Sequence, residues 1–184
     1  MWCRRRCERV GETVMSARPL SVDCTATLVW RGLTFVLVSS RDVAARNCLI
    51  TSRLAAKLSC PRVCRDAYRQ EYCVARGEPL PLRWLPAEAA LDDDFSSRSD
   101  CWSWAVLCWE VLCQGELPHA ALSDDQLTRR LAAEGAPPPL VVPADTPTPL
   151  AAAMARCWAA SPRDRPDMAD VVRTLAVPDA SETE

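Results

Sequence analysis

The strongest hydrophobic pattern in the chain runs through SRSDCWSWAVLCWEVLCQG, residues 97–115. One face of the implied helix carries apolar residues at helical spacing, namely Trp102, Val106, Trp109 and Cys113. The neighbouring face carries a second apolar set, namely Cys101, Ala105, Cys108 and Leu112. A helix that is apolar on so much of its surface belongs in the centre of a protein. The pattern therefore predicts a central helix over this segment, ended by Gly115.

Three further segments predict helices towards the C-terminus. Residues 123–135 begin with a Ser–x–x–Gln capping box and end at Gly135, which is typical of a surface helix. A second helix is expected over residues 149–160, after a proline-rich connection. A last helix is expected over residues 167–175, with Asp167 as its N-cap after Pro166.

The N-terminal half is less regular. Residues 20–38 are apolar, but the first part fits a helix and the second is β-branched, so the type stays open. The runs CLI (48–50) and LAAKLS (54–59) predict a small hairpin around residues 51–53. Residues 60–86 mix charges and prolines without periodicity and predict one long functional loop. We expect one folded domain over residues 20–176, between a disordered basic segment (1–19) and a disordered acidic tail (177–184).

The composition disfavours several classes of protein and agrees with a single folded domain. The chain has 184 residues, of which 49% are hydrophobic, and this is enough for a core. A net charge of −2 argues against a nucleic-acid binder. The 11 cysteines raise a secreted disulfide framework and a zinc site as alternatives. An odd count, and cysteines placed inside apolar helical patterns, favour reduced buried thiols. A single histidine, His119, and the lack of a second cysteine pair at finger spacing disfavour zinc.

The sequence contains no run of 18 uncharged apolar residues, so it predicts no membrane span. The basic start MWCRRRCER is not followed by an apolar segment and is not typical of a signal peptide. A membrane-surface or a nuclear address stays open for it, but a disordered start is the favoured interpretation.

Four motifs follow one another in the order of a kinase domain: RDVAARNCLI (41–50), PLRWLPAE (81–88), SDCWSWAVLCWEV (99–111) and CWAASPRDRP (157–166). Together they resemble the C-terminal lobe of protein tyrosine kinases. The segments DAYRQEYCVARGEPLPLRW and GELPH further resemble the inactive tyrosine-protein kinase seven family of receptor pseudokinases. The resemblance implies a mainly α fold, the C-terminal lobe of the α+β protein-kinase fold. It implies one small β-hairpin, a long activation-type loop and no N-terminal lobe within these residues.

The resemblance also assigns roles within the catalytic loop. Asp42 matches the catalytic base, which accepts the proton of the substrate hydroxyl, and Asn47 matches a magnesium ligand. Arg46 matches the arginine near the substrate tyrosine, and Arg41 matches an arginine that can pair with a phosphorylated activation loop. Ser40 stands where the family usually has histidine, so the loop is altered at its first position.

Three further matches are structural. Glu88 and Arg165 match an ion pair of the family, and Asp100 matches the aspartate of the central helix that holds the backbone of the catalytic loop. Removing one member of a buried pair leaves an uncompensated charge. We therefore expect these three residues to act in folding.

The parts that grip ATP and metal are not matched. Cys60-Pro61-Arg62 stands at the position of the DFG triplet, whose aspartate holds magnesium. Magnesium prefers oxygen ligands, whereas Cys60 offers a soft sulfur and Arg62 a cation. Residues 1–39 hold no glycine-rich loop and no lysine. The sequence therefore predicts no bound cofactor and impaired phosphoryl transfer.

These observations predict a pseudokinase that acts as a signalling interaction module, on the cytoplasmic side of a Wnt or planar-polarity type of receptor. Tyr68 and Tyr72 match activation-loop tyrosines. A phosphate on either can pair with Arg41 or bind a phosphotyrosine-reading partner, and an active tyrosine kinase would be a further partner. That both are ordinary loop tyrosines stays open.

Two other functions also stay open. The first is a protein tyrosine kinase that uses ATP and magnesium and is completed by an N-terminal lobe encoded elsewhere. Stabilisation by nucleotide that grows with magnesium would favour it. The second is a non-functional kinase-domain fragment, whose exposed apolar cleft surface would lower its solubility.

Overall fold

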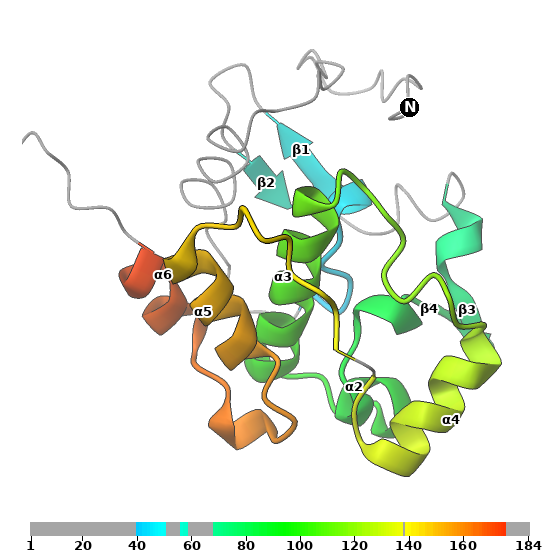
Figure 1. Ribbon diagram of the computed structural model, residues 1–184. Coiled ribbons are helices and arrows are strands. Elements are labelled where there is room, and N and C mark those ends of the chain that lie inside the picture. The colour runs from blue at the N-terminus through cyan, green and yellow to red at the C-terminus, as the bar shows by residue number, and fades with distance from the viewer. Residues whose placement is uncertain (1–39, 51–55, 59–67, 138, 176–184) are drawn as a thin grey trace, which may run out of the picture.

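The computed structural model describes residues 40–50, 56–58, 68–137 and 139–175 (Figure 1). Its helices are α2 (Ala87–Asp92), α3 (Ser97–Leu112), α4 (Asp124–Glu134), α5 (Thr148–Cys157) and α6 (Met168–Leu175). Its strands are β1 (Cys48–Ile50), β2 (Ala56–Leu58), β3 (Cys73–Ala75) and β4 (Glu78–Leu80). Within these ranges no helix is long and apolar enough to cross a membrane. The predicted N-terminal segments over residues 1–38 and the acidic tail lie outside the described residues.

Helix α3 occupies the centre, as its sequence pattern predicts. Every residue from Ser99 to Glu110 is buried. The helix begins with a capping box in which the side chains of Ser96 and Ser99 each accept a hydrogen bond from the other's backbone N–H. It ends at Leu112, and the following turn reaches Gly115 in the left-handed region at φ 86°. The predicted central helix is therefore confirmed, with its C-terminal end one turn earlier.

The other helices pack on two sides of α3 (Figure 1). On one side, Leu150, Ala153 and Met154 of α5 join α3 in the largest hydrophobic core, which Val171 and Leu175 of α6 complete. On the other side, α2 and α4 share a smaller core of Leu82, Leu85, Ala89, Ala90, Leu127 and Leu131. The catalytic-loop motif lies against α3 between these two groups.

The described ranges also contain two antiparallel hairpins. The predicted pairing of residues 48–50 with the 54–59 segment is confirmed, with Cys48 opposite Leu58 in the register. A second hairpin, in which Cys73 lies opposite Leu80, was not predicted. The interpretation of residues 60–86 as one long loop is therefore wrong for residues 73–80. The strands are too short to show alternation, and their turn uses Arg76 and Gly77, both at positive φ, in place of a more typical pair such as Asn-Gly.

The remaining helices follow their predicted signals closely. Helix α4 has the expected capping box, in which Ser123 and Gln126 exchange hydrogen bonds, and Gly135 ends it at φ 70°. Helix α6 is preceded by Asp167, whose Oδ1 accepts a hydrogen bond of 2.7 Å from the N–H of Asp170. Helix α5 ends at Cys157, three residues before the predicted boundary.

Candidate functional site

Two acidic residues of α3 hold the backbone of the catalytic-loop motif. The carboxylate of Asp100 accepts hydrogen bonds from the N–H groups of Ser40 (2.7 Å) and Arg41 (3.4 Å). Farther along α3, Glu110 accepts a bond of 3.0 Å from the N–H of Ala45. Arg41 itself lies in the left-handed region at φ 59°, an unusual backbone for a residue with a side chain. The loop is thus attached to the central helix at both of its ends.

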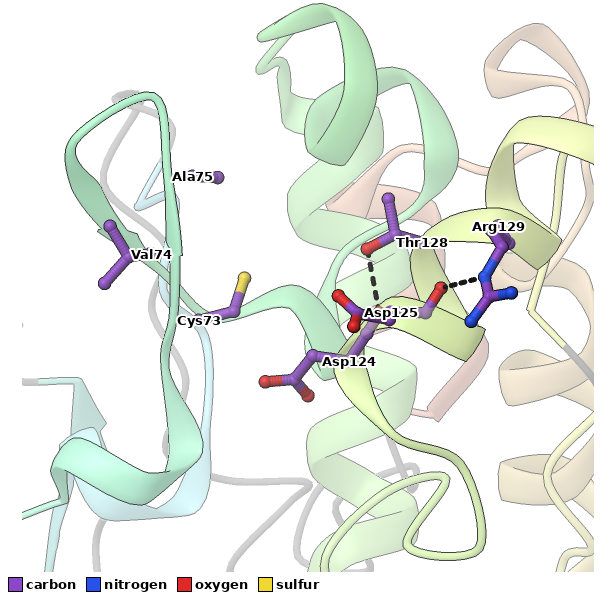
Figure 2. A pocket seen from close by; sticks show the side chains of 7 residues that line it. All are labelled: Cys73, Val74, Ala75, Asp124, Asp125, Thr128 and Arg129. Carbon is purple, nitrogen blue, oxygen red and sulfur yellow. Dashed lines mark hydrogen bonds between the residues drawn. The ribbon is translucent and has the colours of Figure 1, made fainter.

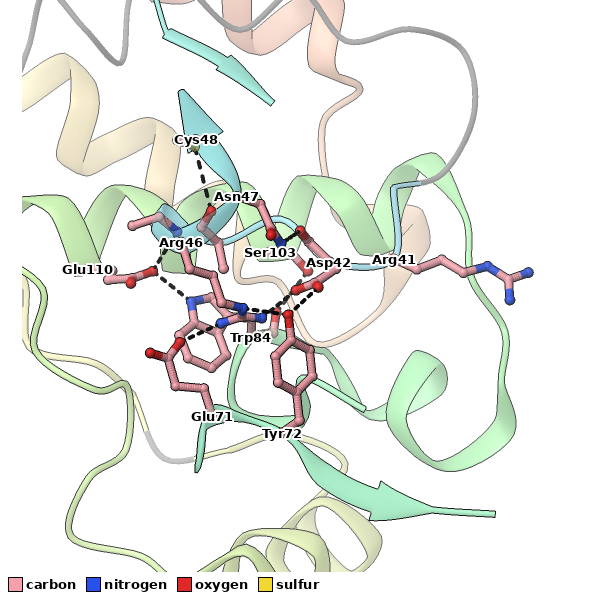
Figure 3. Close-up of polar contacts among 12 residues, drawn as sticks. Arg41, Asp42, Arg46, Asn47, Cys48, Glu71, Tyr72, Trp84, Ser103 and Glu110 are labelled. Carbon is pink, nitrogen blue, oxygen red and sulfur yellow. Dashed lines mark hydrogen bonds and ion pairs between the residues drawn. The ribbon is translucent and has the colours of Figure 1, made fainter. Parts of the chain in front are cut away.

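Asp42 lies in a dense polar cluster, which we call the loop cluster and which consists of Asp42, Arg46, Glu71 and Tyr72 (Figure 3). Asp42 Oδ1 pairs with Arg46 Nη2, and Asp42 Oδ2 accepts a hydrogen bond of 2.7 Å from the hydroxyl of Tyr72. Arg46 Nε donates to the same hydroxyl at 2.7 Å, and its Nη1 pairs with Glu71 at 2.8 Å. Both carboxylate oxygens of Asp42 are therefore engaged by neighbouring side chains.

The guanidinium of Arg46 also lies close to two aromatic rings. Its central carbon lies 4.2 Å from the ring centroid of Trp84 and 4.4 Å from that of Tyr72. Burial lowers the pKa of Arg46, but the nearby charge of Asp42 and the contacts with Tyr72 outweigh it and raise that pKa overall. Burial and the hydrogen bond to Asp42 raise the pKa of Tyr72 to about 12, so its hydroxyl keeps its proton at neutral pH.

Asn47 is completely buried beside this cluster. Its Nδ2 donates a hydrogen bond of 2.8 Å to the backbone oxygen of Asp42, while its Oδ1 has no hydrogen-bond partner among the described residues. An amide oxygen of this kind can act as a ligand for magnesium. Within the loop cluster, the carboxylate oxygens of Asp42 already bind Arg46 and Tyr72, and a guanidinium next to a divalent cation is repulsive. The donor set therefore fits a magnesium ion poorly.

The predicted regulatory residues Arg41 and Tyr72 do not contact each other. Arg41 is exposed and its guanidinium lies over the ring of Phe95 at 4.7 Å, pointing away from Tyr72 (Figure 3). Arg46, and not Arg41, is the arginine that contacts Tyr72. Tyr68 lies just before the short 3-10 helix Arg69–Glu71. The Cys60-Pro61-Arg62 triplet lies outside the described residues.

Glu88 and Arg165 form a two-pronged ion pair between α2 and the segment before α6. Arg165 Nη1 and Nη2 each donate to one carboxylate oxygen of Glu88, the second at 3.2 Å. Arg165 is buried and donates further hydrogen bonds to the backbone oxygens of Arg98, Ala159 and Ala160. This guanidinium therefore holds three segments together, namely α2, the start of α3 and the residues after α5.

Sequence reasoning missed the buried carboxylate of Glu110. Besides Ala45, its Oε2 accepts a hydrogen bond of 2.8 Å from Trp84 Nε1, so it links the catalytic loop to the PLRW motif (Figure 3). Burial raises the pKa of Glu110 to about 7, although both hydrogen bonds act in the opposite direction. A signal was present, because Glu110 is the one charged residue inside the apolar run WAVLCWEVLC. Such a charge predicts a buried, hydrogen-bonded group.

A separate groove lies between β3 and the first turns of α4 (Figure 2). It has a volume of about 550 Å³ and is lined by Cys73, Val74, Ala75, Asp124, Asp125, Thr128 and Arg129. Val74, one of the lining residues, is 82% exposed. None of the lining residues belongs to the loop cluster. The groove is thus a surface feature distinct from the catalytic-loop motif.

The position of α4 beside this groove depends on a buried arginine. Arg83 donates hydrogen bonds to the backbone oxygens of Pro118 (3.2 Å), His119 (2.8 Å) and Leu122 (2.8 Å), and pairs with Asp124 at 2.8 Å. It thereby joins the 3-10 turn Leu82–Trp84 to the connection that precedes α4.

Known proteins are similar to this chain over about three quarters of its length. The chain is 44% identical over 135 residues to "Inactive tyrosine-protein kinase 7" of Gallus gallus and 42% identical over 135 residues to that of Homo sapiens. It is 35% identical over 137 residues to "Tyrosine-protein kinase-like otk" of Drosophila yakuba. These matches cover 73 to 74% of this chain but only 12 to 13% of each relative, so the chain spans about an eighth of their length.

A family model described as protein tyrosine and serine/threonine kinase matches residues 36–175. The matched residues include the loop cluster, α3 and the Glu88–Arg165 pair. The family is the one that the sequence motifs resemble. The described elements, mostly helical with small antiparallel hairpins, agree with the C-terminal lobe of such a domain. Since the model accounts for most of its length, the chain belongs to the protein tyrosine and serine/threonine kinase family.

Proposed function

We propose that this chain is the C-terminal lobe of a pseudokinase and acts as a protein-interaction module in signalling. The observation that carries the proposal is the loop cluster, in which both oxygens of Asp42 accept hydrogen bonds from side chains of the chain itself. A catalytic base must have an oxygen within hydrogen-bond reach of the hydroxyl it deprotonates. In this conformation the hydroxyl of Tyr72 takes that place.

The metal-binding side of the reaction supports the same conclusion. Phosphoryl transfer depends on positioning and on neutralising the charge of the phosphates. The Oδ1 of Asn47 has no hydrogen-bond partner among the described residues, and Arg46 pairs with the neighbouring carboxylate of Asp42. By sequence, Cys60 supplies sulfur at the other ligand position. Magnesium needs several oxygen ligands, so we expect neither magnesium nor ATP to bind with useful affinity.

The interaction role centres on the segment that carries Tyr68 and Tyr72. Tyr72 is half-buried, and its hydroxyl donates to Asp42 and accepts from Arg46, so a phosphate on it removes the hydrogen bond to Asp42. The phosphate would then stand beside the carboxylates of Asp42 and Glu71, where like charges repel it. Phosphorylation would therefore move this segment outwards and present it to a phosphotyrosine-reading partner.

The cellular setting of the proposal rests on the relatives. Their names describe an inactive tyrosine kinase and a tyrosine-kinase-like protein. From the resemblance of the sequence motifs to receptor pseudokinases, we further propose that the chain works on the cytoplasmic side of a receptor of the Wnt or planar-polarity type.

A nucleotide-labelling experiment tests the loss of catalysis. The full chain is incubated with radioactive ATP, magnesium and a tyrosine peptide, beside its Asp42→Asn variant and an active tyrosine kinase. We expect no labelling above that of Asp42→Asn. The matched control is Asp125→Asn, which removes an exposed carboxylate outside the loop cluster. Labelling that persists in Asp125→Asn and disappears in Asp42→Asn would overturn the proposal.

A second experiment tests the interaction role. The chain is treated with an active tyrosine kinase, and the phosphate is located by mass spectrometry in the native chain and in Tyr68→Phe and Tyr72→Phe. We expect the native chain to bind a phosphotyrosine-reading domain only after this treatment. If neither tyrosine accepts phosphate while a control peptide does, the interaction role loses its basis.

One observation favours a second candidate function, a protein tyrosine kinase of low activity. Asp42 and Asn47 keep the spacing of the family motif, and Asn47 Oδ1 is buried without a partner among the described residues. A thermal melt with nucleotide separates the two functions, because stabilisation that increases with magnesium is expected only for the enzyme.

A further inference from the structure

Two buried cysteines of different helices lie in direct contact. Cys101 belongs to the N-terminal part of α3, and Cys157 is the last residue of α5. Their Sγ atoms are 3.3 Å apart, and both residues are 0% exposed. A disulfide bond is about 2.05 Å long, so the two sulfurs need to approach by only about 1.2 Å. They are 56 positions apart in the sequence, so only the folded chain brings them together.

The surroundings distinguish this pair from the other cysteines of the described residues. Burial raises the pKa of Cys48 to about 12 and that of Cys108 well above its usual value. By contrast, the hydrogen bond with Cys157 lowers the pKa of Cys101, and the guanidinium groups of Arg165 and Arg98 act in the same direction. Cys157 correspondingly holds its proton, and its pKa is raised. The pair therefore contains one thiol that ionises more readily and one that donates to it.

We propose that Cys101 and Cys157 are a redox modification site, at which hydrogen peroxide converts the two thiols into a disulfide that joins α3 to α5. The thiolate of Cys101 attacks one peroxide oxygen, the O–O bond breaks, and the other oxygen leaves as water after taking a proton. Cys101 is then a sulfenic acid. The sulfur of Cys157 attacks that of Cys101, and the hydroxyl leaves as a second water with the proton of Cys157. Two electrons pass from the sulfurs to the peroxide, which is consumed.

The physical consequences follow from the positions of the two residues. The bond closes a long loop, which removes conformational freedom from the unfolded chain and stabilises the folded one. Because both thiols are buried, peroxide reaches them only through local opening of the fold, and the reaction is slower than that of an exposed thiol. Cys101 and Cys157 also lie close in sequence to Arg98 and Ala159, whose backbone oxygens accept hydrogen bonds from Arg165, so the bond adds a covalent link near the ion pair of Arg165 with Glu88.

The experiment is peroxide oxidation of the full chain followed by mapping of the crosslink. The chain is fully reduced, freed of reductant and treated with hydrogen peroxide, and the remaining thiols are alkylated. Digestion with trypsin and chymotrypsin cuts after Arg98, Trp102, Arg156 and Trp158, which separates Cys101 from Cys108 and Cys113. We expect one dominant crosslinked pair of peptides, lighter by two hydrogen atoms than the sum of the reduced peptides. We also expect a melting temperature higher by at least about 5 °C.

Two variants and one condition serve as controls. Cys108→Val removes a buried thiol of the same helix, and the crosslink is expected to form unchanged. Cys101→Ser keeps the size of the side chain, and the crosslink and the rise in melting temperature are both expected to disappear. In urea, the bonds are expected to spread over many cysteine pairs. The proposal is overturned if the folded native chain gives the same scrambled pairs as in urea, or if both thiols are still alkylated after peroxide. The native chain alone decides this outcome, so it does not depend on whether a variant folds.

Discussion

The carboxylate of Glu110 is expected to make the stability of this chain depend on pH near neutrality. Glu110 is buried in α3 and accepts hydrogen bonds from Ala45 and Trp84. Burial raises its pKa from 4.5 to about 7. Below pH 4.5 the group is protonated in the folded and the unfolded chain alike. As the pH rises from 4.5 to 7, the unfolded chain releases the proton first, so the free energy of unfolding falls.

The magnitude follows from the difference between the two pKa values. That difference is about 2.5 pH units, and one unit corresponds to about 1.4 kcal/mol, so the loss by pH 8 is about 3 kcal/mol. Glu110→Gln keeps the size of the side chain and an oxygen acceptor for both donors, but it cannot ionise. Relative to the native chain, this variant should therefore become more stable by about 3 kcal/mol between pH 4.5 and pH 8.

Urea unfolding followed by tryptophan fluorescence measures this difference, since the chain has seven tryptophans. Both proteins are unfolded at intervals from pH 4.5 to pH 8, and the difference in free energy of unfolding is plotted against pH. Other titrating groups cancel in this difference. The control is Glu116→Gln, an exposed residue, for which the difference should stay flat. A flat difference for Glu110→Gln, or one that grows towards acid, would refute the reasoning.

Three further substitutions should have measurable effects. Arg165→Leu leaves a carboxylate without its partner and should destabilise the fold by about 3–5 kcal/mol in urea, whereas exposed Arg163→Leu should change little. Burial lowers the pKa of His119 from 6.5 to about 4, so its contribution to stability is present above pH 6.5 and is lost as the pH falls towards 4. In the His119→Asn variant, the new residue tolerates the left-handed backbone at φ 54°. Its melting temperature should fall less than that of the native chain as the pH is lowered from 6.5 to 4, and an equal fall would contradict this. Tyr72→Phe removes a hydroxyl that donates to Asp42 and should lower stability by about 1–2 kcal/mol, and a melting temperature equal to that of the native chain would count against the loop cluster.

Local sequence signals predicted the elements that depend on neighbouring residues. The central helix, the capping box at Ser123 and the stop at Gly135 are each encoded within one or two turns, and all are present. The motif spacing also located the ion pair of Glu88 with Arg165, although 77 positions separate them, because the family resemblance carried that information.

The parts that were missed depend on contacts between distant segments. The hairpin of β3 and β4 is stabilised by pairing across a tight turn and by packing on α2 and α4. A strand of three residues is too short to show the alternation of apolar and polar residues by which a strand is predicted. The contact of Tyr72 with Asp42 joins residues 30 positions apart, and nothing in the composition of the loop indicates it. The same holds for the sulfur contact of Cys101 with Cys157.

Arg83 has a consequence for any partner that binds in the groove. It is not one of the lining residues, yet it pairs with Asp124, which lines one wall, and it holds the connection that precedes α4. Its planar fork leaves this wall little freedom to adjust. The choice of partner at the groove would thus depend partly on a residue that does not line it. A chain with lysine in place of Arg83 would keep every lining side chain and still select different partners.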